Sequence, residues 1–241
     1  MSGRVVLITG GSRGIGLACA RRFQELGDHV AVTYRTSPPA PRDQGGDPLL
    51  ALRCDVAVPE DVEAAFSTLE AELGPAEVLV CSAGITDDGL LMRMSEERWH
   101  QVIETNLTGT FRVAKRAIGP MLKARRGRIV MISSAVAYLG NAGQANYAAS
   151  KAGLVGFARS LAREVAGRSV TVNVVAPGLI DTDMLSALAE EHTAALLSRV
   201  PLARLGDPAE VAAAVEYLAS ASAGYVTGAV LAVDGGLGMG H

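Results

Sequence analysis

Tyr147 and Lys151 are the two residues whose types and spacing best fit acid–base chemistry. They are four positions apart, so on a helix they would share one face, one turn apart. A free phenol has a pKa of about 10, and a neighbouring ammonium group favours the phenolate and brings that pKa toward neutrality. Ser134 follows an apolar run and would place a hydroxyl beside the phenol. The three groups predict a site that holds a carbonyl oxygen and passes it a proton. The alternative is a surface Tyr–Lys pair that only supports a helix.

The surrounding pattern indicates the elements that must position these residues. Residues 128–132 form an apolar run typical of a buried strand, and a helical pattern begins near Asn146 after a glycine-containing loop. Strand and helix patterns alternate along the chain, which predicts an α/β fold: a single doubly wound parallel sheet of Rossmann type with helices on both faces. The expected strands are 5–8, 30–34, 50–54, 78–81, 128–132, 170–175 and 229–233, and the expected helices are 15–26, 60–73, 99–126, one from about 146, and 209–219.

We expect one domain over residues 1–241, because no repeat or domain boundary interrupts this alternation. Residues 36–49 contain three prolines within four positions, which exclude a regular helix, so the second crossover is expected to be an extended loop. An amphipathic segment at 184–198 lies within a region of about 183–205 that we expect to form a lid over an apolar substrate. Simple core packing is the alternative.

A glycine-rich turn joins the first expected strand to the first expected helix, with the sequence Thr-Gly-Gly-Ser-Arg-Gly-Ile-Gly at residues 9–16. Glycines let the backbone approach a pyrophosphate, and the start of a helix supplies free N–H groups and positive potential. We therefore expect a dinucleotide to bind here, although a plain glycine-rich turn is the alternative. The expected contacts in this turn are Gly10, Ser12, Arg13, Gly14, Ile15 and Gly16.

The residues after the second expected strand indicate which dinucleotide binds. An Asp or Glu at this position would bind the ribose 2′-hydroxyl of NAD. Here the position is taken by Arg35, followed by Thr36 and Ser37, and Arg13 lies in the glycine-rich turn itself. Arginines and hydroxyls without a carboxylate suit a 2′-phosphate, so NADP is the expected cofactor. Two solvated arginines are the alternative.

Further cofactor contacts are expected in turns that follow other strands. The Asp55 carboxylate, next to Val56, could accept a hydrogen bond from the adenine amino group, although an N-capping role explains it equally well. Turns of small residues or of Pro-Gly follow the fourth expected strand and the strand at 170–175, and they let backbone approach a ligand. The residues expected there are Ala83, Gly84, Pro177 and Gly178.

Asn106 lies on an otherwise apolar face of the expected helix 99–126. One interpretation is a buried structural amide whose hydrogen bonds are all satisfied. The other is a clamp for water or backbone near Lys151. The sequence leaves both open.

Composition excludes several classes of function. The net charge of −3 does not suggest nucleic-acid binding. The three cysteines and four histidines are scattered, which fits neither a metal site nor a disulfide framework and favours the reducing cytoplasm. No basic region precedes a long apolar stretch, and no window approaches 18 clean apolar residues, so we expect neither secretion nor a membrane span.

The chain resembles the short-chain dehydrogenase/reductase family over its full length. The Thr-Gly-x-x-x-Gly-x-Gly loop at 9–16 carries the resemblance, as does the thirteen-residue step from Ser134 to Tyr147. The stretches 141–151 and 173–178 most resemble bacterial 3-oxoacyl-[acyl-carrier-protein] reductases, and the Pro-rich second crossover and Gly-Met-Gly-His end resemble the mycobacterial long-chain type. One departure is Cys81-Ser82 where the family has Asn-Asn, which puts any bracing role of the Asn amide in doubt.

The resemblance implies a catalytic tetrad and a mechanism. The tetrad is Asn106, Ser134, Tyr147 and Lys151. Tyr147 would protonate the oxygen of a 3-oxoacyl thioester while NADPH donates a hydride, and Ser134 would hold the same oxygen. Lys151 would hold the nicotinamide ribose, and Asn106 would position a water that links Lys151 to solvent. Tyr147 and Lys151 thus also contact the cofactor, and Thr182 with the Ile180 backbone would bind its carboxamide.

An acyl carrier protein and a homotetrameric assembly are further expectations from the resemblance. A carrier protein is acidic, so a net negative enzyme needs a local basic patch to dock it. We expect that patch at Arg125, Arg126 and Arg168, beside the mouth of the site, with Lys123 and Arg128 nearby. Solvated cations favoured by helix ends are the alternative.

Other functions remain open from the sequence. The same chemistry could serve a polyketide intermediate or an acyl-CoA, and an oxidising dehydrogenase of small alcohols is a second possibility. A non-catalytic nucleotide-sensing protein is a third, because fold does not fix function. The intact tetrad argues against a sensor. Chain-length preference cannot be derived from the sequence.

Overall fold

Seven parallel strands form one sheet in the computed structural model, which describes residues 3–40, 49–182 and 196–239. The strand order is β3-β2-β1-β4-β5-β6-β7. The order reverses between β1 and β4, and in doubly wound sheets ligands bind in the crevice outside the carboxyl ends of the strands at such a point. The strands are β1 (Val5–Thr9), β2 (His29–Tyr34), β3 (Leu50–Arg53), β4 (Val78–Cys81), β5 (Gly127–Ile132), β6 (Val170–Pro177) and β7 (Val230–Val233).

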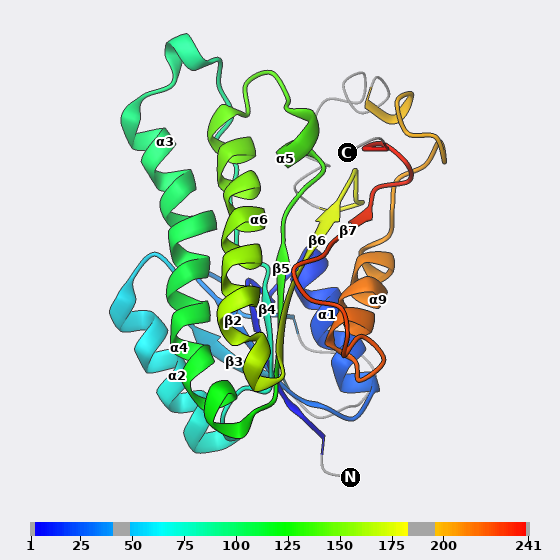
Figure 1. Cartoon of the computed structure of the whole chain (residues 1–241). Helices are drawn as coiled ribbons and strands as arrows, with labels where there is room; N and C mark the ends of the chain where they lie inside the picture. The colour runs from blue at the N-terminus through cyan, green and yellow to red at the C-terminus, as the bar shows by residue number, and fades with distance from the viewer. Residues whose placement is uncertain (1–2, 41–48, 183–195, 240–241) are drawn as a thin grey trace.

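Helices cover both faces of the sheet, as Figure 1 shows. One face is covered by α1 (Gly14–Glu25) and α9 (Pro208–Ala219). The other is covered by α2 (Pro59–Glu72), α4 (Gly109–Ala124) and α6 (Ala145–Val165). Two apolar cores result, because alternate residues of each strand face opposite sides: Leu7 packs under the second group of helices, and Val6 and Ile8 pack under the first. The expected fold class is confirmed.

Burial on both faces explains why the strands could be predicted from the sequence. All five residues of β1 and all four of β4 are buried. Parallel strands of this type are continuous apolar runs rather than alternating ones. The pairing of β5 with β6 runs from Gly127 with Val170 to Ile132 with Val175, which brings the chain after both strands to the same edge of the sheet.

The expected helix 99–126 is instead three consecutive segments. They are α3 (Glu96–Ile103), a π-helical turn (Glu104–Thr108) and α4. The hydroxyl of Ser95 caps α3 by accepting a hydrogen bond from the Arg98 N–H. The sequence also did not indicate a short helix after β5, α5 (Val136–Leu139), or two 3₁₀ turns, Leu91–Arg93 and Ala166–Arg168.

Two expectations lie partly outside the described residues. The second crossover is irregular over residues 36–40, where it is described, and residues 41–48 are not. Residues 183–195 of the expected lid are also outside the described part of the chain. A lid over 183–205 therefore stays a prediction.

Candidate active site

The predicted tetrad comes together at the carboxyl ends of the strands, at the upper end of the molecule in Figure 1. Ser134 follows β5, and Tyr147 and Lys151 lie one turn apart on α6. The hydroxyl of Ser134 and the phenol of Tyr147 share a hydrogen bond. The strand end and the helix thus place both hydroxyls where one substrate oxygen can meet them.

Lys151 is buried beneath the phenol, with 4% of its surface exposed. Its Nζ atom donates a hydrogen bond to the Ile132 carbonyl oxygen at 2.8 Å and lies 5.7 Å from the centre of the Tyr147 ring. Burial disfavours the charged ammonium and lowers the pKa of Lys151 to about 8. A buried cation whose pKa is this close to neutrality is typical of functional sites.

The expected lowering of the phenol pKa is wrong for the free protein. The pKa of Tyr147 is raised, because burial disfavours the phenolate. The hydrogen bond with Ser134 lowers that pKa in part, and the negative charge of Asp88 raises it further. The sequence did not reveal that Asp88 lies close enough to influence the phenol. At neutral pH the phenol therefore keeps its proton and is a donor.

Asn106 lies in the π-helical turn and is completely buried. Its Oδ1 accepts from the Ile85 N–H at 2.8 Å, and its Nδ2 donates to the Ile85 carbonyl and to the Ser150 hydroxyl, both at 3.0 Å. These bonds support the interpretation of Asn106 as a satisfied structural amide. π-helical turns often occur at functional sites, because they re-aim side chains locally. A water held near Asn106 stays a prediction.

Gly84 lies close to the side chains of both Asn106 and Lys151. A Cβ atom at this position would be 3.2 Å from Asn106 Oδ1 and 3.3 Å from Lys151 Nζ. The absence of a side chain at Gly84 therefore lets the amide and the ammonium approach the turn after β4. The approach of this backbone to a ligand, which the sequence indicated, stays a prediction.

The glycine-rich turn forms an open cradle between β1 and α1. Arg13 is the N-cap residue of α1, and an arginine has no acceptor with which to cap a helix. Gly10 has φ of +66°, and a Cβ there would lie 2.7 Å from the Ala83 Cα, so the turns after β1 and β4 meet closely. Thr182 faces Gly14 across the site: a Cβ on that glycine would be 3.5 Å from its methyl group. This arrangement fits a dinucleotide.

The other predicted cofactor residues lie along the same edge of the sheet. Arg35 follows β2 and is exposed, as is Arg13. Asp55 follows β3 and accepts from the Ala57 N–H at 3.0 Å, a local turn, while Val58 rather than Asp55 is the N-cap residue of α2. The remaining members lie at four places: Ser12 after β1, Ile15 and Gly16 in the first turn of α1, Val56 after β3, and Pro177, Gly178 and Ile180 at and after the end of β6.

Sequence reasoning missed the role of Thr9 at the end of β1. Its hydroxyl accepts from the N–H groups of Ser82 and Ala83, each at 3.2 Å. These bonds tie β1 to the turn after β4, where the family's Asn-Asn is replaced by Cys81-Ser82. The Thr9 hydroxyl and two backbone N–H groups therefore brace this junction without an Asn amide. The signal was present, since Thr9 opens the glycine-rich motif.

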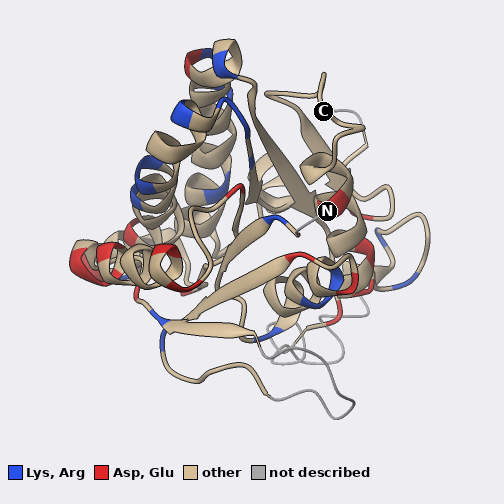
Figure 2. Ribbon diagram, turned by 90° about the horizontal axis from the view of Figure 1, so that it is seen from below, with Lys and Arg blue, Asp and Glu red and all other residues tan. Residues whose placement is uncertain are grey.

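The basic cluster of Arg125, Arg126 and Arg168 does not lie beside the mouth of this site in the same chain. The expectation that it would is therefore wrong. Arg125 and Arg126 directly precede β5 and therefore lie at its amino end, and Arg168 follows the last residue of α6. At about 1.5 Å per helical residue, α6 separates Arg168 from Tyr147 by about 30 Å. Figure 2 views the molecule from this lower end and shows Lys and Arg along the helices on one side of it.

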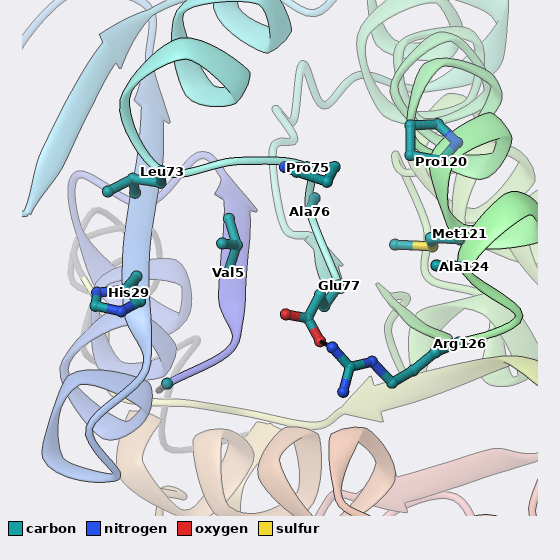
Figure 3. Close-up of a pocket in the computed structure, with 11 residues that line it drawn as sticks. Val5, His29, Leu73, Pro75, Ala76, Glu77, Pro120, Met121, Ala124 and Arg126 are labelled. Carbon is teal, nitrogen blue, oxygen red and sulfur yellow. Dashed lines mark ion pairs between the residues drawn. The ribbon is translucent and has the colours of Figure 1, made fainter. Parts of the chain in front are cut away.

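A cavity of about 360 Å³ lies at the same lower end, below β1 and β4. Figure 3 shows its largely apolar walls and the Glu77–Arg126 ion pair at its edge. Its lining contains no member of the tetrad or of the glycine-rich turn. It is therefore separate from the candidate active site.

In the described ranges 3–40, 49–182 and 196–239, no cluster of three or more His, Cys, Asp or Glu side chains is suited to a metal ion. The three cysteines are buried and unpaired. Among the described helices, none is both long and apolar enough to cross a lipid bilayer.

The chain belongs to the short-chain dehydrogenase/reductase family. A family model described as enoyl-(acyl carrier protein) reductase matches residues 10–238. The chain is 50% identical over 241 residues to the 3-oxoacyl-[acyl-carrier-protein] reductase FabG of Vibrio cholerae, covering 99% of both chains. It is 52% identical over 238 residues to the reductase MabA of Mycobacterium tuberculosis, covering 99% of this chain and 94% of the relative. FabG of Escherichia coli is 48% identical over 239 residues, with 98% of both chains covered. The resemblance inferred from the motifs is confirmed.

Proposed function

We propose that this protein is an NADPH-dependent reductase of 3-oxoacyl thioesters carried by acyl carrier protein, in fatty-acid biosynthesis. One observation carries the proposal: two hydrogen-bonded hydroxyls, Ser134 and Tyr147, stand above a buried Lys151 at the edge that also carries the glycine cradle. The names of the three relatives support the choice of substrate.

Each residue of the tetrad has a separate role in the proposed reduction of a carbonyl group. When bound, the cofactor supplies a hydride to the carbonyl carbon. Tyr147 donates its proton to the carbonyl oxygen, and its raised pKa keeps that proton available. Ser134 donates a hydrogen bond to the same oxygen, where negative charge develops. Lys151 stabilises the phenolate that remains, and a water beside Asn106 carries a proton back from solvent.

The cofactor proposal rests on Arg13 and Arg35. Both are exposed at the edge of the sheet that carries the cradle, and the three residues directly after β2, at 35–37, include no carboxylate. We assign them to the 2′-phosphate of NADP, to which each would make charge-assisted hydrogen bonds. The Ile180 backbone and Thr182 are assigned to the carboxamide, because Thr182 faces Gly14 across the cradle.

Reduction of an enoyl thioester is the second candidate, since the matching family model carries that description. In that reaction the proton ends on a carbon atom rather than on the carbonyl oxygen. Two hydroxyls that converge on one oxygen suit carbonyl reduction better. Purified protein should therefore oxidise NADPH with acetoacetyl thioester and not with crotonyl thioester. NADPH oxidation with crotonyl thioester but not with acetoacetyl thioester would favour the enoyl reaction. If NADPH were oxidised with neither substrate, the nucleotide-sensing alternative would be left. A panel of thioesters from short to long, on CoA and on carrier protein, would establish the preferred chain length and carrier.

A homotetramer is part of the proposal, and it gives the basic cluster a role. Phe111 of α4 is 44% exposed and packs edge-on against Phe157 of α6, which leaves an apolar surface on these helices. If two copies packed antiparallel across α4 and α6, the arginines of one copy would lie beside the site of the other. Burial lowers the pKa of Arg128, and the positive charges of Arg4 and Arg126 lower it further by a repulsion that an acidic carrier surface would relieve.

Charge reversal tests this docking. An Arg125→Glu/Arg168→Glu variant should have a higher KM for carrier-bound substrate, with an effect that shrinks at high salt. Its rate with a small thioester should not change. Equal losses with both substrates would mean that the arginines serve folding or assembly instead.

A further inference from the structure

The first turn of α6, which carries Tyr147, has no side-chain cap from its N-cap residue. Gln144, the N-cap residue of α6, turns its side chain to Asp88 Oδ2 at 2.8 Å rather than to the helix. The first N–H groups of a helix need other acceptors when the N-cap supplies none. Tyr147 is the third residue of α6, so its N–H is one of these groups.

Asn146 supplies that acceptor from inside the helix. Its Oδ1 accepts from the Tyr147 N–H at 2.8 Å, and its Nδ2 donates to the Asp87 carbonyl oxygen at 2.9 Å. Asn146 is completely buried, so this amide has no water to replace either partner. One side chain therefore links the backbone of Tyr147 to the segment at 87–89.

An ion pair from α3 fixes that segment in turn. The Nε of Arg98 donates to Asp87 Oδ1 at 2.8 Å, and its Nη2 donates to the same oxygen and to the Asp88 carbonyl. The absence of a side chain at Gly89 leaves space for the guanidinium, because a Cβ there would lie 2.8 Å from Arg98 Nη1. The Gly89 N–H donates to the Gly143 carbonyl at 2.7 Å, which adds a second link to the loop before α6.

We propose that Asn146 and the Asp87–Arg98 ion pair are positioning residues that hold the Tyr147 phenol in line for proton transfer. The chain of contacts runs from α3 through residues 87–89 to the first turn of α6, and it ends on the backbone of Tyr147. None of these side chains needs to touch the substrate. The inference rests on the proposed carbonyl reduction.

Arg98→Met tests the ion pair, because methionine keeps an apolar stem and removes the guanidinium. We expect kcat for acetoacetyl thioester to fall by about 10-fold to 10²-fold, since a displacement of about 1 Å can cost that much. The KM for NADPH should stay within about twofold, because the glycine cradle is untouched. The solvent deuterium isotope effect on kcat should rise, because proton transfer becomes slower relative to the other steps. Asn146→Ala should act in the same direction and more strongly.

Two further variants separate positioning from stability. Arg98→Lys keeps a cation that can donate to Asp87 and should retain most of the kcat that Arg98→Met loses. Arg22→Met removes a comparable ion pair between α1 and α9, Arg22 with Glu216 at 2.6 Å, far from α6. It should leave kcat and the isotope effect unchanged.

Unchanged kcat and isotope effect in Arg98→Met would overturn the inference, as would an equal loss of kcat in Arg22→Met. Either result would still leave the unmodified protein reducing acetoacetyl thioester. Failure of the proposed function is different, because the unmodified protein would then not turn over that substrate at all.

Discussion

The Nζ atom of Lys151 donates a hydrogen bond of 2.8 Å to the carbonyl oxygen of Ile132, the last residue of β5. The helix α6 therefore presents its cation to the end of the strand that leads to Ser134, and not directly to the phenol one turn away. The ammonium lies 5.7 Å from the centre of the Tyr147 ring, close enough to stabilise a phenolate once the proton has left. The free protein holds the proton on Tyr147, which is the form that reduction requires.

Replacing Tyr147 by Phe removes the proton donor and keeps the ring. We expect kcat for acetoacetyl thioester to fall by about 10² to 10⁴-fold. NADPH should still bind, which a titration of nucleotide fluorescence would measure. Tyr217→Phe, at a half-exposed tyrosine of α9, is the matched control and should keep full turnover. Near-normal turnover in Tyr147→Phe would rule out the mechanism.

Replacing Arg35 by Asp should shift the cofactor preference strongly toward NADH. The substitution removes a charge-assisted bond worth about 1.5–3 kcal/mol and sets a carboxylate near the 2′ position. The ratio of kcat/KM with NADPH to that with NADH measures the effect, and Arg21→Asp, at an exposed arginine of α1, should leave the ratio unchanged. If the unmodified protein already used both cofactors equally, the assignment of Arg35 would be wrong.

Much of the site could be predicted because its signals are local. The strand before Ser134 is buried on both faces and therefore continuously apolar, and the spacing of Tyr147 and Lys151 already indicates a shared helix face. The glycine-rich turn lies directly between an apolar strand and a helix. Each of these features depends on residues close together in the chain.

The features that the sequence did not predict depend on contacts between distant segments. The π-helical turn follows from the bonds of Asn106 to Ile85 and Ser150, not from local helix propensity. The raised pKa of Tyr147 follows from burial and from Asp88, 59 positions earlier in the chain. The expectation that Arg125 lies beside the site was avoidable from the sequence. A residue that directly precedes a strand lies at the amino end of that strand, and the site lies at the carboxyl ends.

Replacing Lys151 by Met should stabilise the fold in a way that depends on pH. The pKa of Lys151 falls from an ordinary value of 10.5 to about 8 on burial, so the unfolded chain binds more protons between these values. The cost of burying the cation is therefore complete below pH 8 and disappears as the pH rises to 10.5. The pKa shift corresponds to a cost of burial of about 3 kcal/mol, which Lys151→Met removes. The variant also loses the hydrogen bond to the Ile132 carbonyl, which contributes about 1.5–3 kcal/mol, so the net gain in stability is smaller.

Urea unfolding of both proteins at pH 7 and at pH 10 measures this effect. The free energy of unfolding of Lys151→Met, minus that of the unmodified protein, should be smaller at pH 10 than at pH 7. Lys115→Met, at an exposed lysine of α4, should show no such change with pH. A difference for Lys151→Met that is the same at both pH values would contradict the burial of a charged lysine.

Adding a single methyl group at Gly84 should damage the site more than the fold. The new Cβ would lie 3.2 Å from Asn106 Oδ1 and 3.3 Å from Lys151 Nζ, and neither atom can retreat without straining its own hydrogen bonds. We expect Gly84→Ala to lose about 10-fold or more in kcat, because the ammonium moves relative to Tyr147. Gly156→Ala is the matched control, since nothing lies within 4 Å of its Cβ in the middle of α6. It should keep full turnover and stabilise the helix by up to about 1 kcal/mol. Equal turnover in the two variants would show that Gly84 does not set the position of Lys151.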